Sequence, residues 1–215
     1  MVPRIIFEDE HVIVVEKPAG LLTMATDTER SKTVYAVLRA YLNEKKHPER
    51  LFIVHRLDRE ASGLLVFAKS TAAQKQLQDQ FKDHSAGRRY IAVVEGRVKP
   101  DDFTIRSYLA ENAAYHVYST SNKKIGKLAV THAHVLKRHA KTTLLEVCLE
   151  TGRKHQIRVH LAEQGHPIVG DKNYGTGFNP IRRLALHGAN LEFRHPATGK
   201  IMRLEAAYPK AFDSV

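Results

Sequence analysis

The sequence sets one carboxylate between two guanidinium groups, an arrangement that could do chemistry. Residues 55–60 read HRLDRE, so Asp58 has Arg56 and Arg59 close by, and a hydrophobic run at residues 64–68 follows. Neighbouring positive charges favour the ionised form of a carboxylate. An ionised aspartate can act as a nucleophile or a base, and it can equally form an ion pair that only holds structure. Taken alone, these residues leave both interpretations open.

A second group of charged side chains lies in the stretch TGRKHQIR. His155 and Arg158 are three residues apart on a helix predicted over residues 154–164, so they share a face. Arg153 and Lys154 lie at the start of this helix, where backbone N–H groups also favour anions. The pattern is typical of a phosphate-contacting helix, and also of a solvated charged face.

A tyrosine that could contact a nucleic-acid base follows two arginines in the stretch GRRYIAVVEG, where Tyr90 opens an apolar strand. A tyrosine in such a place usually packs half-buried. Its ring can also stack on a base. Both interpretations stand at this point.

The sequence lacks the common patterns that bind a cofactor or a metal. It contains no glycine-rich phosphate-binding motif, no H-E-x-x-H pair and no G-x-S-x-G turn. Cys148 is the only cysteine, which excludes a cysteine-rich zinc site. The sequence therefore gives no support for a nucleotide-binding cradle or a cysteine-rich zinc site.

Hydrophobic periodicity predicts the elements that must position these residues. Helices are predicted over residues 34–42, capped by Thr33, and over residues 72–84, capped by Ser70 or Thr71. Strands are predicted at IIF, VIVVE, LFIV, GLLVFA, RRYIAVVEG, THAHVLKRH and TTLLEVCLE, with a closing pair at LALHGANLEFRHP and KIMRLEAAYP around a turn at PATGK. Few helices and no β-α-β alternation predict an α+β fold with a mainly antiparallel or mixed sheet.

The overall charge indicates a polyanionic partner. Lysine and arginine number 34 against 23 aspartates and glutamates, a formal net charge of +11 in 215 residues. A domain this basic usually binds nucleic acid. Because the sequence has a single cysteine, no export signal and no apolar run long enough to span a membrane, we expect a cytoplasmic protein without a membrane partner.

Five stretches of the chain together resemble the motifs of one enzyme family. HRLDREASGLLVFAKS resembles the catalytic motif of the pseudouridine synthases of the RluA type, VVEKPAGL their K-P-x-G element, and RRYIAVVEG their tyrosine-bearing strand. TGRKHQIRVHLAEQGHPIVGDKNYG is similar to their late arginine motif, and LALHGANLEFRHP to their closing strand. The matches follow the family's order from Glu8 to Tyr208.

This resemblance implies an enzyme that isomerises uridine in RNA to pseudouridine without a cofactor or metal. Asp58 then matches the essential aspartate, which either attacks the sugar C1′ or the base, or takes part in proton chemistry at C2′. Arg158 matches the residue that pairs with this aspartate, and Tyr90 the tyrosine that packs against the target base. Arg56 matches a residue that fills the gap left by the flipped-out nucleotide.

We also expect RNA contacts from basic side chains of these motifs, namely Lys17, Arg56, Arg59, Arg153, Lys154 and His155. The partner would be an rRNA or tRNA stem-loop, bound by a monomer. RNA choice is expected to rest on the loops at residues 23–32 and 111–128, of which SNKKIGK in the second could contact phosphates.

The resemblance further implies the architecture: an α+β fold with a mixed, largely antiparallel sheet in two lobes and a central active-site cleft. We expect one catalytic domain over residues 1–215, with no separate N-terminal RNA-binding module.

Two other functions compete with this one. A non-catalytic RNA-binding or ribosome-assembly factor would use the same basic surface, but phosphate binding alone needs no buried carboxylate. A glycoside-type hydrolase would need two cooperating carboxylates. Glu60, two residues from Asp58, is the nearest second carboxylate, and this spacing at a turn does not make the two face each other.

Overall fold

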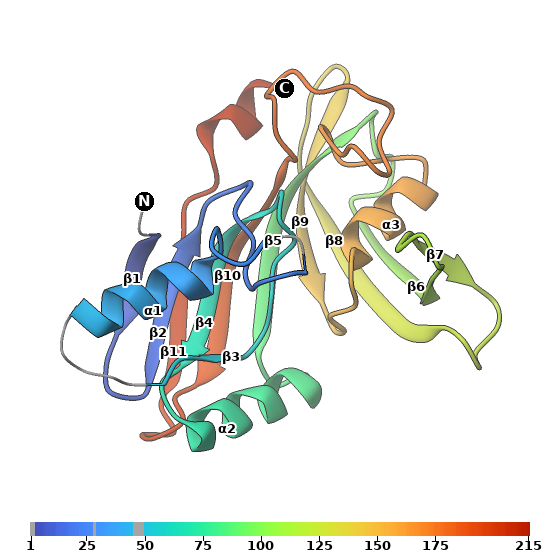
Figure 1. Ribbon diagram of the computed structural model, residues 1–215. Helices are drawn as coiled ribbons and strands as arrows, with labels where there is room; N and C mark the ends of the chain where they lie inside the picture. The colour runs from blue at the N-terminus through green and yellow to red at the C-terminus, as the bar shows by residue number, and fades with distance from the viewer. Residues whose placement is uncertain (1–2, 28, 45–49) are drawn as a thin grey trace. The chain divides into compact units, whose positions relative to one another are not determined.

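The computed structural model describes residues 3–27, 29–44 and 50–215 (Figure 1). The chain divides into two compact units. The first contains the described residues within Met1–Arg88 and Gly188–Ala207, and the second contains Arg89–His187 and Tyr208–Val215. Asp58 therefore belongs to the first unit, whereas Tyr90 and Arg158 belong to the second.

The first unit is built on a largely antiparallel sheet. The ladders between β1 and β2, β2 and β4, β3 and β4, and β10 and β11 are all antiparallel. Every residue of β4 is buried, as a continuous apolar run predicts for a strand covered on both faces. The strands lie in the order β1 (Arg4–Glu8), β2 (Val12–Lys17), β4 (Ser62–Ala68), β10 (Leu186–Arg194) and β11 (Ile201–Glu205), with β3 (Phe52–Ile53) also paired to β4.

Two helices of this unit begin where their capping residues predict. α1 (Val34–Glu44) follows Thr33, whose hydroxyl oxygen accepts a backbone N–H bond of 3.0 Å. α2 (Thr71–Lys82) follows Ser70, whose hydroxyl oxygen accepts a backbone N–H bond of 3.1 Å. Leu77 of α2 is fully buried in an apolar cluster with side chains of β2, β4 and β10. The apolar side of α2 thus packs onto the sheet that carries the Asp58 loop.

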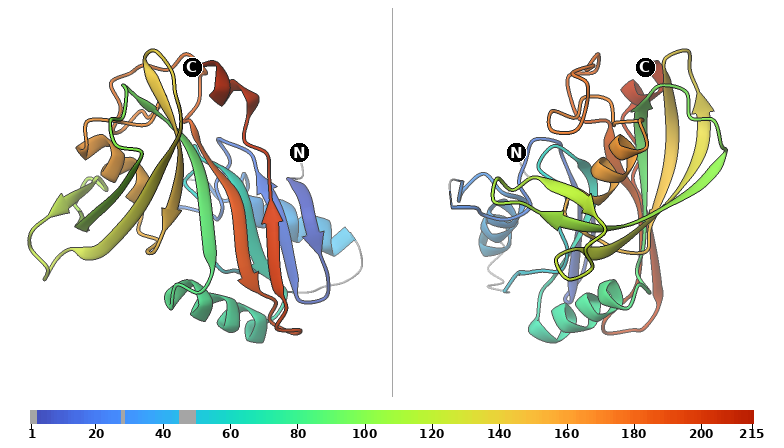
Figure 2. Two further views of the ribbon diagram at one scale, coloured as in Figure 1. Left: turned by 180° about the vertical axis from the view of Figure 1, so that it is seen from behind. Right: turned by 90° about the vertical axis from the view of Figure 1, so that its right-hand side faces the viewer.

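The second unit contains antiparallel strands and one α-helix that packs beside them (Figure 2). The long strand β8 pairs antiparallel with β6 along one edge and with β9 along the other. The strands lie in the order β5 (Gly87–Glu95), β9 (Thr142–Leu149), β8 (Lys127–Arg138), β6 (Asp102–Glu111) and β7 (Val117–Thr120). The helix α3 (Gln156–Glu163) contacts β7 and β8, and a 3-10 helix (Lys210–Ser214) follows near the C-terminus.

The sequence analysis missed strands β6 and β7, and it began β8 four residues late. Only three of the ten residues of β6 are buried, so its apolar signal is weak. Pairing with β8 supplies the backbone hydrogen bonds that make it a strand. The segment at residues 111–128, predicted as a loop, therefore contains β7 and the first residues of β8.

The helix predicted over residues 154–164 begins later than expected. α3 starts at Gln156, because the preceding His155 adopts a left-handed backbone conformation with φ of +53° and acts as the N-cap. Lys154 and His155 therefore lie in the turn before the helix, with Arg153.

The predicted fold class is confirmed: the described residues form an α+β protein with largely antiparallel pairing. The turn at PATGK is also confirmed, since the backbone N–H of His195 donates to the Lys200 carbonyl at 2.8 Å between β10 and β11. In the predicted loop 23–32, residue 28 lies outside the described residues. Within the described part of the chain, every helix is too short or too polar to cross a membrane.

Candidate active site

Asp58 lies on the loop that joins β3 to β4 in the first unit. Its side chain is partly buried, and it follows the buried Leu57. Arg56 and Arg59 are exposed on the same loop. The loop thus presents one carboxylate flanked by two guanidinium-bearing residues.

A threonine from another part of the chain holds the backbone just before Asp58. Thr23 is buried, and its hydroxyl contacts both backbone groups of Leu57. The N–H of Leu57 donates to Thr23 Oγ1 at 3.2 Å, and this hydroxyl donates to the Leu57 carbonyl at 3.1 Å. Because one hydroxyl satisfies two buried backbone groups, the position before the carboxylate has little freedom to move.

A buried lysine holds the backbone just after Asp58. Lys17 has no exposed surface, and its ammonium donates to the carbonyls of Pro18 (3.0 Å), Leu21 (2.7 Å) and Arg59 (3.0 Å). A buried ammonium requires such partners, and these three bonds match its three N–H donors. Direct RNA contact, predicted for Lys17 from its motif, does not fit this burial. Its observed contacts instead make it a support for the Asp58 loop.

A glycine completes this support by joining the K-P-x-G element to the Asp58 loop. Gly20 has φ of +86°, a conformation that side chains other than glycine rarely adopt. Its N–H donates to the Arg59 carbonyl at 2.8 Å, and Arg59 Nε donates back to the Gly20 carbonyl at 3.3 Å. The two motifs, widely separated in the sequence, therefore form one hydrogen-bonded structure around Asp58.

His55 extends the β4 ladder beyond the end of β3. Its Nε2 accepts a hydrogen bond of 3.2 Å from the N–H of Val66, and its ring stacks on Phe81 with centroids 4.5 Å apart. Burial, together with the nearby Arg88, lowers the pKa of His55 to about 3. The imidazole is therefore neutral near pH 7, as an Nε2 that accepts a hydrogen bond requires. His55 therefore anchors the start of the loop to β4 and α2.

Arg158 of α3 forms a two-point ion pair with Asp171 in the second unit. Arg158 Nε lies 2.7 Å from Asp171 Oδ2, and Nη2 lies 2.8 Å from Oδ1. The side chains are 3% and 0% exposed. A two-point pair fixes the plane of the guanidinium as well as its position. Arg158 is therefore held in a defined orientation by a residue that the sequence analysis did not single out.

Asp171 also accepts backbone hydrogen bonds from the turn that follows it. Oδ1 accepts from the N–H groups of Asn173 at 2.9 Å and Tyr174 at 3.1 Å. Burial alone would raise the pKa of Asp171, but the hydrogen bonds and charge of Arg158 and these two N–H groups lower it below its usual value. The carboxylate is therefore ionised at neutral pH.

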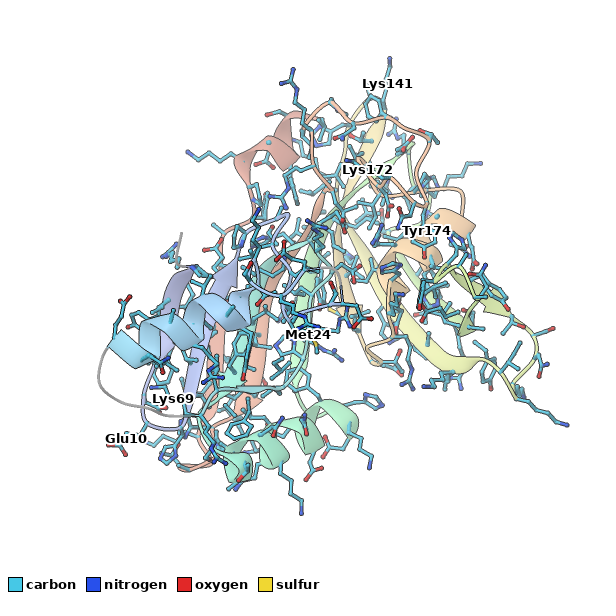
Figure 3. The ribbon with its side chains drawn as sticks, viewed as in Figure 1. Glu10, Met24, Lys69, Lys141, Lys172 and Tyr174 are labelled. Atoms are coloured by element: carbon cyan, nitrogen blue, oxygen red, sulfur yellow. The ribbon has the colours of Figure 1, made fainter. Side chains whose placement is uncertain are left out.

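Tyr174, labelled in Figure 3, links this ion pair to the turn before α3. The Arg158 guanidinium lies over the Tyr174 ring, 5.2 Å from its centroid. The Tyr174 hydroxyl lies 2.9 Å from His155 Nδ1 and accepts a hydrogen bond of 3.2 Å from the N–H of Val117. The aromatic ring thus joins α3, β7 and the loop at residues 171–175.

The residues before α3 that were predicted to contact RNA lie at the surface of the second unit. Arg153 and Lys154 are exposed, and His155 is partly buried. Arg153 Nε donates to the Leu128 carbonyl at 3.0 Å, and Lys154 pairs with Glu111. The structure brings these three residues together, close in the chain to Arg158.

Tyr90 lies in β5, opposite Val147 of β9, and is 6% exposed. Within the second unit it lies on a strand whose residues 89–95 pair with β9. Asp58 belongs to the first unit.

Sequence reasoning missed the residues that orient the predicted ones. The stretch GDKNYG was interpreted as a glycine-rich loop, although its aspartate and tyrosine are Asp171 and Tyr174. A polar residue between glycines directly after an apolar run was the available signal. Among the described residues, no group of three or more histidine, cysteine, aspartate or glutamate side chains is arranged to hold a metal ion.

Solved structures define the class of this protein. The fold is similar to that of human RNA Pseudouridylate Synthase Domain Containing 4, with a TM-score of 0.80 and 25% identity over 98% of this chain and 90% of that chain. It is also similar to human RNA Pseudouridylate Synthase Domain Containing 1, with a TM-score of 0.78 and 24% identity over 96% and 84% of the two chains. The fold is that of the pseudouridine synthases.

The family model for RNA pseudouridylate synthase matches residues 11–163, and the chain belongs to this family of isomerases. A Bacillus subtilis protein named uncharacterized RNA pseudouridine synthase YhcT is 36% identical over 95% of this chain and 68% of that protein. The ribosomal large subunit pseudouridine synthase D of Neisseria meningitidis is 39% identical over 95% of this chain and 58% of that protein. These similarities confirm the RluA-type family. The chain spans 58% to 68% of the length of these two relatives.

Proposed function

We propose that this chain is an RNA pseudouridine synthase in which Asp58 is the essential carboxylate. The reaction breaks the N1–C1′ bond of a uridine and joins C1′ to C5, so that C5 loses a proton and N1 gains one. The observation that carries the proposal is the support of the Asp58 loop by Thr23 on one side and by Lys17 and Gly20 on the other. A reagent needs such positioning more than a surface ion pair does.

Two routes are compatible with an aspartate in this role. In one, the carboxylate attacks C1′ or the base and forms a covalent intermediate. In the other, it takes part in proton chemistry at C2′ and the base leaves by elimination. Both need a single carboxylate held in a fixed position at the target nucleotide. A uridine deuterated at C2′ separates the two routes. Only the elimination route breaks the C2′–D bond and gives a primary isotope effect.

Arg158 and Tyr90 complete the proposed catalytic set. We assign Arg158 the task of keeping Asp58 ionised, for which an always-charged guanidinium with a fixed plane is suited. Tyr90 is assigned to the target base, where its ring packs against the uracil and its hydroxyl takes part in removing the C5 proton. The pairing of the Tyr90 strand with β9 and the ion pair that holds Arg158 support these roles.

RNA binding is assigned to the exposed basic residues of the two units. Arg56, exposed beside Asp58, would fill the gap that a flipped-out uridine leaves, since unstacking a base requires compensation. Arg59, Arg153, Lys154 and His155 would contact the RNA backbone. The proposed substrate is a stem-loop of rRNA or tRNA in the cytoplasm, bound by a monomer whose residues 1–215 form one catalytic domain. A relative named for the ribosomal large subunit supports rRNA.

Release of tritium from RNA labelled at uridine C5 tests the proposal. We expect wild-type protein to release tritium and Asp58→Asn to release none while it still binds RNA. Asp79→Asn, an exposed aspartate on α2, is the matched control and should retain full release. If wild-type protein bound RNA and released no tritium from total cellular RNA, the assembly-factor function would replace this one.

A further inference from the structure

A groove in the second unit combines apolar side chains with three cations, of which only Lys127 has no role in the proposed function. Its volume is about 470 Å³. Leu109 of β6 and Val117 of β7 supply buried apolar surface, and Ile125 lies at the edge with 58% of its surface exposed. The cations Lys127, Arg153 and Lys154 also line the groove. Its lining thus combines apolar and positively charged side chains.

The edges of this groove are held by hydrogen bonds. The turn before β8 closes through Asn122, whose carbonyl accepts from the N–H groups of Ile125 at 3.3 Å and Gly126 at 3.0 Å. Arg153 is tied to β8 by its bond to the Leu128 carbonyl. The groove is therefore formed before any ligand arrives, which lowers the entropy lost on binding.

The charge of the groove favours an anion. The single acidic residue among its lining residues, Glu111, pairs with Lys154. Lys127 and Arg153, both exposed, add two positive charges. Next to the groove, Tyr115 is 76% exposed, and the Lys154 ammonium lies 5.4 Å from the centroid of its ring. An exposed aromatic ring beside cations is typical of surfaces that stack a base and neutralise its phosphate.

We propose that this groove binds one nucleotide of the RNA substrate other than the target uridine. The base would lie against the apolar side chains of the groove, Ile125 among them, and the adjoining phosphates would contact Lys127 and Arg153. A volume of this size is within the range of small-molecule sites. The identity of the ligand as RNA rests on the proposed function, and the groove adds a strand contact that influences which RNA is bound.

Substitutions at Lys127 and Ile125 test the groove, with Lys141 as control. Lys127 begins β8, whereas Lys141 is an exposed lysine that follows its other end, about 40 Å along the strand (Figure 3). We expect Lys127→Gln to weaken binding of C5-tritiated RNA about fivefold and to lower the salt slope of log Kd by about one. Ile125→Ser should weaken binding about as much, with an unchanged salt slope, because it removes an apolar contact.

Lys141→Gln should change the Kd less than twofold and the salt slope by less than the Lys127 variant does. The groove proposal is overturned if Lys127→Gln and Ile125→Ser both bind RNA as Lys141→Gln does. Tritium release reports separately on the proposed function. If both groove variants weaken RNA binding while the wild-type protein releases no tritium, the groove proposal is retained and the isomerase function is rejected.

Discussion

The guanidinium of Arg158 and the carboxylate of Asp171 face each other across two hydrogen bonds of 2.7 and 2.8 Å, with both side chains almost completely buried. Two buried charges at this distance depend on each other, because either one left alone would carry a large desolvation penalty. Asp171 is therefore a positioning residue for Arg158. It fixes the arginine proposed to keep Asp58 ionised.

Asp171→Asn should destabilise the second unit and reduce turnover. The asparagine keeps one carbonyl oxygen for the backbone N–H groups of residues 173 and 174 but leaves the Arg158 charge buried without a counter-ion. We expect the free energy of unfolding to fall by about 3 kcal/mol, as measured in urea. Asp171→Glu, which keeps the charge, should recover part of the turnover at saturating RNA. Equal tritium release by Asp171→Asn and wild type, per folded molecule, would argue against positioning.

Arg158→Leu should reduce turnover more than RNA affinity. Leucine removes the charge proposed to keep Asp58 ionised, whereas the exposed residues before α3 that are assigned to RNA remain. Arg158→Lys should recover little, because an ammonium cannot form the two-point pair with Asp171. The measurements are kcat for tritium release and Kd for the same RNA. An unchanged kcat in Arg158→Leu would remove Arg158 from the catalytic set.

Lys17→Met should impair catalysis through the Asp58 loop. Methionine has a similar length but donates no hydrogen bond, so the Arg59 carbonyl loses its 3.0 Å contact. Lys69→Met is the matched control, because Lys69, labelled in Figure 3, is also nearly buried in the first unit but pairs with Glu8. Both variants should lose about 1–3 kcal/mol of stability. Only Lys17→Met should also lower kcat per folded molecule, and similar kcat values in the two would contradict the support role.

The stability of the protein should fall in mild acid because His55 and His160 are neutral in the folded state. The pKa of His55 is lowered to about 3 by burial and Arg88, and burial lowers the pKa of His160 to about 4, where its ring nitrogens contact Thr131 and Ser107. Histidines in the unfolded chain titrate at about pH 6.5. Between that pH and about 4, the unfolded chain therefore binds more protons than the folded protein does. The free energy of unfolding should therefore decrease as the pH falls through this window.

Urea unfolding at several pH values between 7 and 4 measures this decrease, which each histidine can steepen by up to about 1.4 kcal/mol per pH unit. His160→Gln should flatten the curve. His84→Asn, at an exposed position whose left-handed backbone asparagine tolerates, should leave the curve unchanged. The lowered pKa of Asp171 affects stability only in a more acidic range. The ionised carboxylate stabilises the folded protein, and this stabilisation is lost as the pH falls below 3.8. Identical curves for wild type and His160→Gln would contradict the contribution of His160 to the loss of stability in acid.

Local sequence signals were sufficient where neighbouring residues determine the structure. Helical periodicity and the hydroxyls of Thr33 and Ser70 determined where α1 and α2 begin. The unbroken apolar run of β4 determined a central strand. The motif around Asp58 was recognisable because its residues are contiguous. Strand β6, with its weaker apolar pattern, depended on pairing with β8 and could not be recognised locally.

By itself, the sequence determined the family, the fold class and the residues of its motifs, since these are properties of residue order. Only the tertiary structure decided what those residues touch. It made Lys17 a buried support for the Asp58 loop, where an RNA contact had been predicted. It also paired Arg158 with Asp171 across a loop. The physical reason is desolvation: whether a charge is exposed to water or must find a buried partner depends on the packing around it, and residue order does not contain that packing.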